Sequence, residues 1–445
     1  MKKVIKTISV ALVLTLIMSI TAFAEPGFAY EDEVLKEFSP LWSQIQADDT
    51  VISVTPGATV GELRFAWLSS STDCNPTFKV SENSNMADAE VFEVITDEAI
   101  ENLRSNKVTV TGLEEGKTYY YSYTKNGVLS QAQQFTVQPA DDFTVLYISD
   151  AQIGRSGDET LEEILIRDTC GWNYTVEKML TAYPDAAFAI SGGDQFQSAD
   201  SLVQMKAYLS PEALRCLPVA NTIGNHDDDS TLYGEIFNNP NEVDELNPGE
   251  AGTGYYYTYG DVLFITINSN NNFMIDTAKV LREATQAYPD TKWRVVTMHH
   301  NPYSASLSDD DFSEERLFFS SLYDLYDIDL CLSGHDHFYS RTDTMYAGEV
   351  TDGEGTVYVQ SSSASGSNYD PLPESTASFT VSAFDVRVPT YTAFKFTVDA
   401  IVGTSYRTDT DEIIDSFEIL DNTTDSDVNF FTIIILFFKT LFSMI

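Results

Sequence analysis

The chain is poor in cysteine and in positive charge. Its 445 residues include four cysteines, which lie far apart and form no CxxC pair. Neither a zinc ribbon nor a framework of disulfide bonds is therefore predicted. Lysine and arginine together number 25 against 68 aspartates and glutamates, and the formal net charge is −43. This charge argues against nucleic acid as a sequence-read partner. It also means that a phosphate substrate needs local positive charge, for which bound metal ions are the obvious source.

Long hydrophobic runs are confined to the two ends of the chain. A basic start, an apolar run over 10–20 and the small residues of Ala22-Phe23-Ala24 form the pattern of a cleaved signal peptide. We therefore expect residues 1–24 to be removed and the mature protein to be exported to the extracellular space or the cell surface. A second apolar stretch, 428–445, is shorter than the roughly 20 residues of a spanning helix. A weak membrane anchor, a gene-end artefact and a core element remain open for this tail.

The composition between these ends is that of a folded protein. Hydrophobic residues make up 43% of the chain and aromatic residues 12%, enough to offset the entropy lost on ordering. We find no internal repeat and no low-complexity linker. The length allows two or three domains with sizeable cores.

Two regions differ in hydrophobic periodicity. From 45 to 139, short alternating segments such as 62–67 are separated by turn signals, which predicts a small antiparallel β-sandwich. From 142 to 420, apolar strands such as 143–149 alternate with helical stretches, which predicts an α/β domain with a central sheet covered on both faces. Residues 355–420 return to strand signals, and we assign them to the last strands of this domain.

All five histidines lie in three short motifs, each directly after an apolar run. These motifs are Gly224-Asn225-His226-Asp227, Met298-His299-His300 and Gly334-His335-Asp336-His337. Two further motifs follow strands in the same way, Ser149-Asp150-Ala151-Gln152 and Gly192-Gly193-Asp194-Gln195. A lone histidine is more often a core residue, and a lone aspartate after a strand is more often a helix cap. Five such motifs in one domain instead predict oxygen and imidazole donors that converge on one edge of a sheet.

The ordered set D-x-Q, G-D, G-N-H-D, H-H and G-H-D-H resembles the calcineurin-like metallophosphoesterase superfamily. The preceding sandwich resembles a fibronectin type III module and is similar to the one in front of the purple acid phosphatase branch. Residues 334–341 resemble that branch's GHxHxYxR stretch. The resemblance spans about residues 45–420 and implies a metallophosphoesterase β-sandwich core flanked by helices, preceded by a small all-β fibronectin III-like sandwich.

The resemblance also implies a centre of two metal ions. It places Asp150 and His337 on the first metal, Asn225, His299 and His335 on the second, and Asp194 between them. A carboxylate suits the bridging position because its two oxygens and its charge can hold two cations about 3.5–4 Å apart. Mixed oxygen and nitrogen donors suit iron, manganese or zinc, either divalent or of mixed valence.

Two positions depart from the family pattern. Where much of the superfamily has a histidine, this chain has Gln152, a neutral and weaker donor. We count Gln152 among the metal ligands, and direct ligation and ligation through a water molecule both remain open. The purple enzymes carry a tyrosine three residues after the aspartate of their G-D motif, and that position here is Gln197. We therefore expect neither tyrosinate ligation nor a purple colour.

The expected reaction is attack of a metal-bound hydroxide on a small phosphate ester. The resemblance implies that His226 donates a proton to the leaving oxygen and that Asp227 orients its ring. We prefer His299 to His300 as the ligand because His299 follows its strand directly. The remaining residues, His300, Tyr339 and Arg341, are expected on the substrate side, with pairing of Arg341 to a carboxylate as the alternative.

A phosphate monoester is the preferred substrate class. The alternatives are a phosphodiesterase acting on nucleotides or glycerophosphodiesters and a non-catalytic binding protein of the cell surface. Retention of Asp194, Asn225 and His226 together argues against the binding protein, because a site without catalysis would be free to lose them.

Overall fold

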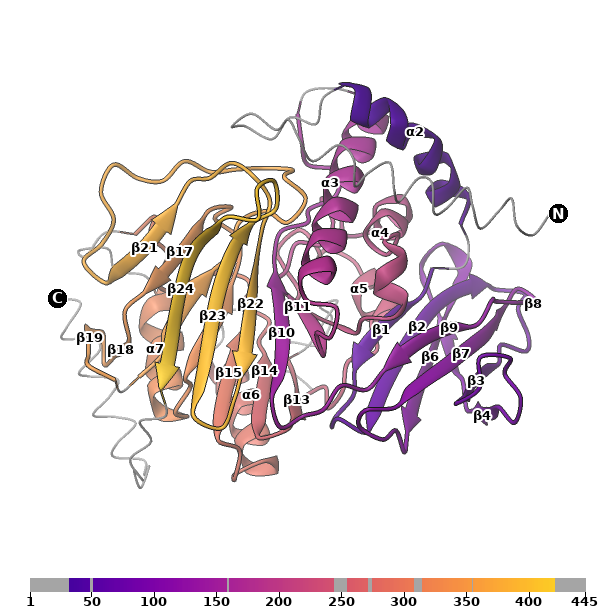
Figure 1. Ribbon diagram of the computed structural model, residues 1–445, viewed down its shortest axis with the longest axis horizontal. Helices are drawn as coiled ribbons and strands as arrows, with labels where there is room; N and C mark the ends of the chain where they lie inside the picture. The colour runs from indigo at the N-terminus through magenta and orange to yellow at the C-terminus, as the bar shows by residue number, and fades with distance from the viewer. Residues whose placement is uncertain are drawn as a thin grey trace.

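The structure is a computed structural model, and it describes residues 32–48, 51–157, 160–243, 254–270, 274–307, 314–353 and 355–420 (Figure 1). The predicted signal peptide, 1–24, and the hydrophobic tail, 428–445, lie outside these residues and stay predictions. Within the described ranges, no helix is both long enough and apolar enough to cross a membrane.

The first part of the chain forms two antiparallel sheets packed face to face. One has the order β1 (Ser53–Pro56), β2 (Glu62–Ser70), β6 (Leu103–Thr111) and β5 (Ile95–Glu98). The other contains β4 (Glu90–Phe92), β3 (Phe78–Ser81), β7 (Thr118–Lys125), β8 (Val128–Leu129) and β9 (Gln133–Thr136). The alternation in β2 points Phe65 into the core, where its ring centroid lies 4.6 Å from that of Phe78 on the facing sheet. Aromatic packing between the sheets therefore holds this sandwich together.

The larger part of the chain is built on two further sheets. The first has six strands, β12 (Val219–Asn221), β11 (Phe188–Ser191), β10 (Phe143–Ile148), β22 (Thr390–Phe396), β23 (Ala400–Arg407) and β24 (Ile413–Leu420). The second has seven, β13 (Tyr255–Tyr259), β14 (Val262–Thr266), β15 (Trp293–Thr297), β16 (Leu330–Ser333), β20 (Val357–Gln360), β17 (Tyr339–Thr342) and β21 (Thr380–Phe384). Side chains of both sheets, among them Tyr147, Phe264 and Phe394, form one buried cluster.

Helices cover the outer faces of this sandwich. On the six-stranded sheet, α3 (Leu161–Ala182) and α4 (Leu202–Tyr208) share a core with β10 and β11. On the seven-stranded sheet, α6 (Met274–Ala287) and α7 (Glu314–Leu325) share a core with β14 and β15. The expectation of one central sheet is therefore wrong, whereas the sandwich flanked by helices is confirmed. Alternating strands and helices in a sequence show that parallel strands exist, but not how many sheets they share.

Strand direction brings the motifs to one end of the sandwich. The pairs β10·β11 and β11·β12 are parallel in the first sheet, as are β14·β15, β15·β16 and β16·β20 in the second. Each of the five motifs begins within a few residues after one of these strands. The hydroxyl of Tyr147 on β10 donates to the carbonyl of Ser333 at the end of β16, which ties the two sheets together at this edge.

Two helices join the amino-terminal region to the larger part of the chain. Helix α2 (Asp32–Ala47), which the sequence pattern did not predict, packs against α3 and α4 through the buried Trp42. Helix α5 (Leu232–Ile236) begins five residues after Asp227 and packs against β2 and β6. Just beyond it, the amide of Asn238 donates to the carbonyls of Phe65 and Val108 at 3.3 and 3.0 Å. The first sandwich therefore anchors the chain segment that follows the histidine of the G-N-H-D motif.

The remaining elements are short. They are the 3-10 helices η1 (Ile100–Asn102) and η2 (Glu212–Arg215) and the hairpin of β18 (Met345–Tyr346) and β19 (Glu349–Val350).

Candidate metal centre

The candidate ligands sit in strained turns after their strands. Asp150, Asp194, His335 and His337 have φ angles of 51°, 52°, 77° and 53°, and Gln152 has 35°. A residue other than glycine in this left-handed region costs of the order of 1 kcal/mol or more, and it persists where its surroundings over-determine it. Gly193 has a φ of 109°, and a Cβ at this position would collide with the ring of His299. Close approach of two motif loops therefore requires this glycine.

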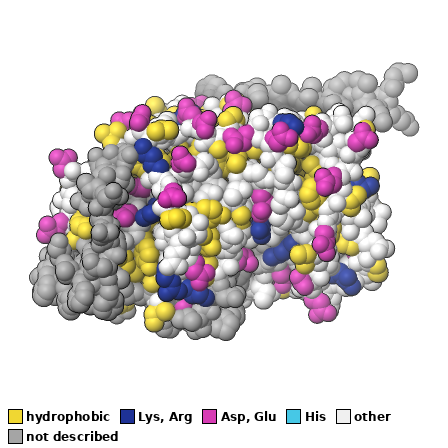
Figure 2. Space-filling model, turned by 90° about the horizontal axis from the view of Figure 1, so that it is seen from below, with side chains coloured by type: hydrophobic (Ala, Val, Ile, Leu, Met, Phe, Trp, Pro, Cys, Tyr) yellow, Lys and Arg dark blue, Asp and Glu magenta, His cyan; other side chains and the backbone are white. Residues whose placement is uncertain are grey.

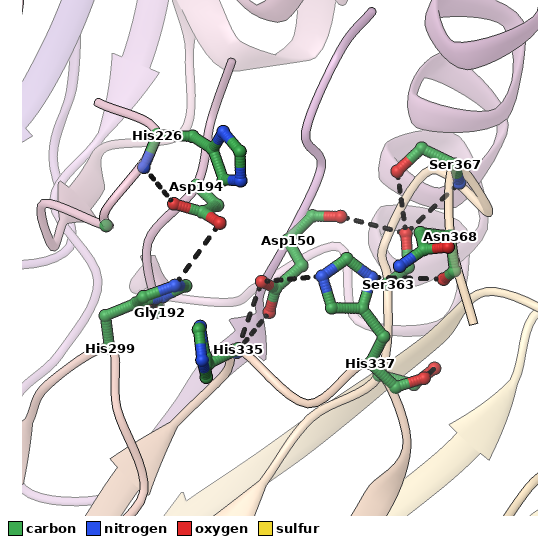
Figure 3. Close-up of polar contacts among 12 residues, drawn as sticks. Asp150, Gly192, Asp194, His226, His299, His335, His337, Ser363, Ser367 and Asn368 are labelled. Atoms are coloured by element: carbon green, nitrogen blue, oxygen red, sulfur yellow. Dashed lines mark hydrogen bonds and ion pairs between the residues drawn. The ribbon is translucent and has the colours of Figure 1, made fainter. Parts of the chain in front are cut away.

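Asp194 lies between His226 and His299 (Figure 3). Its Oδ2 is 3.3 Å from Nε2 of His299, and its Oδ1 accepts a hydrogen bond of 2.9 Å from the backbone N–H of His226. The same Nε2 is 3.1 Å from Oδ1 of Asn225, which in turn is 3.1 Å from Nδ1 of His335. Donor atoms of these side chains thus converge on one small region, as the ligands of a cation do.

Asp150 and His337 form a second group of donors beside the first. Oδ1 of Asp150 is 3.5 Å from Nε2 of His337, and both of its carboxylate oxygens accept the backbone N–H of His335. The ligand atoms of Asp150, Asp194 and His299 all lie within 4.8 Å of one another. Gln152 lies two residues after Asp150 in the sequence, and its side chain is buried. Its Oε1 has no hydrogen-bond partner among the described residues. An orphaned amide oxygen is costly unless it meets a ligand, so this donor set fits a further cation.

Backbone carbonyls determine which nitrogen of two histidine rings is free. Nδ1 of His299 lies 2.9 Å from the carbonyl oxygen of Gly192, and Nδ1 of His337 lies 3.2 Å from that of Asn368. Because a carbonyl can only accept, each Nδ1 carries the hydrogen. Each Nε2 then faces a carboxylate, and it can offer its lone pair to a cation when it carries no proton of its own. This is the orientation in which a protein holds a metal-binding imidazole.

Burial and charge act against each other at the centre. Burial alone would lower the pKa of the His299 imidazole, but the Asp194 carboxylate outweighs it and raises that pKa to about 10. Burial likewise opposes the charge of Asp194, yet His299 holds the pKa of this carboxyl below its ordinary value. Burial raises the pKa of the Asp150 carboxyl. A proton on His299 thus partly neutralises the two buried carboxylates, and a cation that binds here must displace it.

Asp227 does not orient the ring of His226, so this prediction is wrong. Its carboxylate is fully buried and accepts the backbone N–H groups of Gln195, Phe196 and Gly224 at 3.0, 3.2 and 2.8 Å. It therefore joins the loop of Asp194 to the loop of Asn225. Nδ1 of His226 lies instead 3.2 Å from the carbonyl oxygen and 3.3 Å from the side-chain amide of Gln197.

Tyr339 and Arg341 are structural residues, which corrects their expected place on the substrate side. The hydroxyl of Tyr339 donates to Asp415 on β24 at 2.9 Å, and Nε of Arg341 donates to the same carboxylate at 2.7 Å. The Arg341 guanidinium also lies 4.5 Å from the ring centroid of Phe417. The alternative, pairing of Arg341 with a carboxylate, is what the structure shows. Strand β17 directs these side chains toward Asp415 on β24 of the other sheet.

His300 lies beside the candidate ligands. Its ring centroid is 4.4 Å from that of His335, and its Nδ1 is 2.8 Å from Oγ of Ser269. Burial lowers the pKa of His300 to about 3, helped by the neighbouring His299 and His335, so the ring is neutral. Its predicted substrate-side role stays a prediction. Ser269 follows β14, and the same reasoning about strand ends could have identified it.

A serine-rich loop, 361–368, also contacts the site, although the sequence pattern predicted only strands in this region. It follows β20, a parallel strand, and carries five serines in eight residues. In Figure 3, Ser363 and Asn368 lie directly against Asp150 and His337. A search of the sequence for acidic residues and histidines alone therefore missed this loop.

Comparison with known proteins finds a family model that matches part of the chain and solved structures of similar fold. Residues 143–339 match the family model of the calcineurin-like phosphoesterases. The purple acid phosphatase PPD1 from yellow lupin (Lupinus luteus) seeds is similar over 86% of this chain and 75% of its own, with a TM-score of 0.66 and 15% identity. The structure of PhoD is similar over 94% and 99%, with a TM-score of 0.54 and 11% identity. At such identities the two structures show a shared fold. No curated protein matches the chain.

Replacement of the Asp194 carboxylate tests whether this side chain binds metal or only supports the fold. We expect the purified protein to hold close to two metal ions per chain and Asp194→Asn to lose at least one of them. Activity should fall by more than about 100-fold, because even partners of a ligand contribute 10–100-fold. Metal content is measured by plasma mass spectrometry after gel filtration. Asp73→Asn, a buried aspartate of the first sandwich, is the matched control and should keep both metals. Full metal content in Asp194→Asn would contradict the assignment.

Proposed function

We propose that this chain, which carries a calcineurin-like phosphoesterase domain, is an exported enzyme that hydrolyses phosphate monoesters with the help of two metal ions. The convergence of the Asp150, Asp194 and His299 donor atoms within 4.8 Å carries the proposal. The hydrogen bonds at Nδ1 that direct Nε2 of His299 and His337 toward carboxylates support it. The fold shared with a purple acid phosphatase supports monoesters as the substrate class.

Positive charge for a phosphate group is scarce on this molecule. The face in Figure 2 shows acidic side chains scattered widely over the surface. In the described loops after β10, β11, β12, β14, β15 and β16, the only lysine or arginine is Arg155, whose side chain is exposed. Arg341 is held by Asp415. When bound, two cations would supply the missing positive charge and lower the pKa of a nucleophilic water.

We infer that His226 delivers a proton to the leaving group. Its backbone N–H is fixed by Asp194, and its Nδ1 lies against both the carbonyl oxygen and the side-chain amide of Gln197. Gln197 can therefore hold the ring whichever nitrogen carries the hydrogen. The half-buried ring leaves Nε2 available to a substrate at the same edge. Positioned acids of this kind contribute about 10²–10⁴-fold to a rate.

A comparison of leaving groups tests both the substrate class and the acid. The wild type should hydrolyse an alkyl phosphate and p-nitrophenyl phosphate faster than bis(p-nitrophenyl) phosphate. His226→Ala should keep both metals and slow the alkyl phosphate by about 10²–10⁴-fold. It should impair p-nitrophenyl phosphate far less, because nitrophenolate leaves almost without a proton.

Three results would contradict parts of this proposal. A wild type that prefers the diester is a phosphodiesterase. A metal-loaded wild type that turns over none of the three esters is consistent with a binding protein. Equal slowing of both monoesters in His226→Ala would show that His226 positions the phosphate without acting as the acid.

Export rests on the amino-terminal pattern of a basic start, an apolar run and Ala22-Phe23-Ala24. Mass spectrometry of the mature protein, expressed in a cell that secretes proteins, should find an amino terminus near Glu25. An intact Met1 would contradict cleavage.

A further inference from the structure

The loop 361–368, here called the serine loop, contacts the turns of Asp150 and His337 at several points (Figure 3). Oγ of Ser363 donates to the carbonyl of Asp150 at 2.9 Å, and Oγ of Ser365 donates to that of Ala151. Oγ of Ser362 donates to the carbonyl of His337 at 3.0 Å. The three hydroxyl groups belong to buried side chains. They satisfy carbonyl groups that water does not reach.

The hydroxyls are themselves held in place. Oγ of Ser363 accepts the backbone N–H groups of Gly366 and Ser367, both at 3.2 Å, so its one hydrogen is left for Asp150. Oγ of Ser365 accepts the N–H of Ser367 at 3.1 Å and gives its hydrogen to Ala151. Each serine is therefore a fixed link between the serine loop and the metal loop.

The same loop sets the ring of His337. The carbonyl oxygen of Asn368 accepts Nδ1–H of His337 at 3.2 Å, which directs Nε2 toward Asp150. Asp150, Gln152 and His337 all have positive φ angles. Residues in this region need neighbours that over-determine their conformation, and the serine loop provides them for Asp150 and His337.

The other half of the centre has a different support. Asp227 joins the loops of Asp194 and Asn225 through backbone N–H groups, and Gly192 orients His299. The described hydroxyl contacts of the serine loop include none with these residues. The backbones of the two halves are joined, since the N–H groups of Asp150 and Gln152 donate to the carbonyls of Gly193 and Asp194. The hydroxyl support of the serine loop, however, falls on the turns of Asp150 and His337 alone.

We propose that the serine loop is the positioning device of one cation position only, the one formed by Asp150, Gln152 and His337. This proposal rests on the proposed function. Its serines do not bind the cation. They hold the carbonyls behind the ligands, and their loss lets Asp150 and His337 leave the geometry that the cation needs. Removal of the hydroxyls should therefore empty this position and leave the one at Asp194, Asn225 and His299 filled.

The test is metal binding by the full mature chain, stripped of metal and titrated with Mn²⁺ alone. The wild type should bind two ions. The double variant Ser363→Ala/Ser365→Ala should bind one with unchanged affinity and the other at least 10-fold more weakly, since supporting contacts contribute 10–100-fold to metal affinity. Its electron paramagnetic resonance spectrum should change from a coupled pair to an isolated Mn²⁺. Ser361→Ala is the matched control, because its buried Oγ contacts only the carbonyl of Ser362, and it should bind two ions.

Each outcome separates this inference from the proposed function. A wild type that binds fewer than two ions contradicts the proposed function itself. Suppose that the wild type binds two ions and that the folded double variant binds both as tightly, or loses both equally. This result would overturn the positioning role of the serine loop and leave the proposed function standing. If circular dichroism shows that the double variant is unfolded, Ser363→Cys, which keeps a weaker donor of similar shape, is titrated instead. It should weaken one ion selectively, and wild-type affinity for both would overturn the proposal.

Discussion

Two carboxylates buried close together, Asp150 and Asp194, are the constraint on which the rest of the site depends. Each is almost completely shielded from solvent, and an ionised carboxylate in such a place needs a compensating positive charge. The protein offers a protonated His299 in the absence of metal. It offers little other positive charge, because the chain has a net charge of −43 and the Arg341 guanidinium forms an ion pair with Asp415. A pair of cations is the compensation that fits the imidazole and amide donors around these carboxylates.

The fold meets this constraint with rigid supports that lie behind the ligands. Asp227 holds the loops of Asp194 and Asn225, and the serine loop holds the turns of Asp150 and His337. The first sandwich fixes the segment that continues from the G-N-H-D motif through Asn238. These contacts offset the backbone strain of the turns that carry the ligands. The ligands can keep left-handed backbone conformations that they would leave in an isolated loop.

The sequence was most informative where strand geometry alone decides the outcome. Parallel strands end at a common edge, so the convergence of Asp150, Asp194, Asn225, His299, His335 and His337 followed from their positions after apolar runs. Metal binding by these residues stays a prediction. The division of the strands into two sheets did not follow from periodicity, because pairing between distant strands leaves no local signal. Helix α2 was missed for a related reason, since its packing partners α3 and α4 lie far along the chain.

Errors arose where the direction of one side chain mattered. Asp227 follows His226 directly, yet its carboxylate turns back to the backbone of Gln195 and Phe196. Tyr339 and Arg341 belong to a family-like stretch, but their partner Asp415 lies on a strand of the other sheet. The serines at 361–368 were overlooked because a hydroxyl that supports a ligand has no motif of its own.

Anomalous X-ray scattering from crystals of the Mn²⁺-loaded protein would locate the cations themselves. We expect two peaks about 3.5–4 Å apart, with the Asp194 carboxylate between them. Asp150, Gln152 and His337 should surround one peak, and Asn225, His299 and His335 the other. A single peak, or peaks away from Asp194, would contradict the claim that two cations neutralise the buried carboxylates.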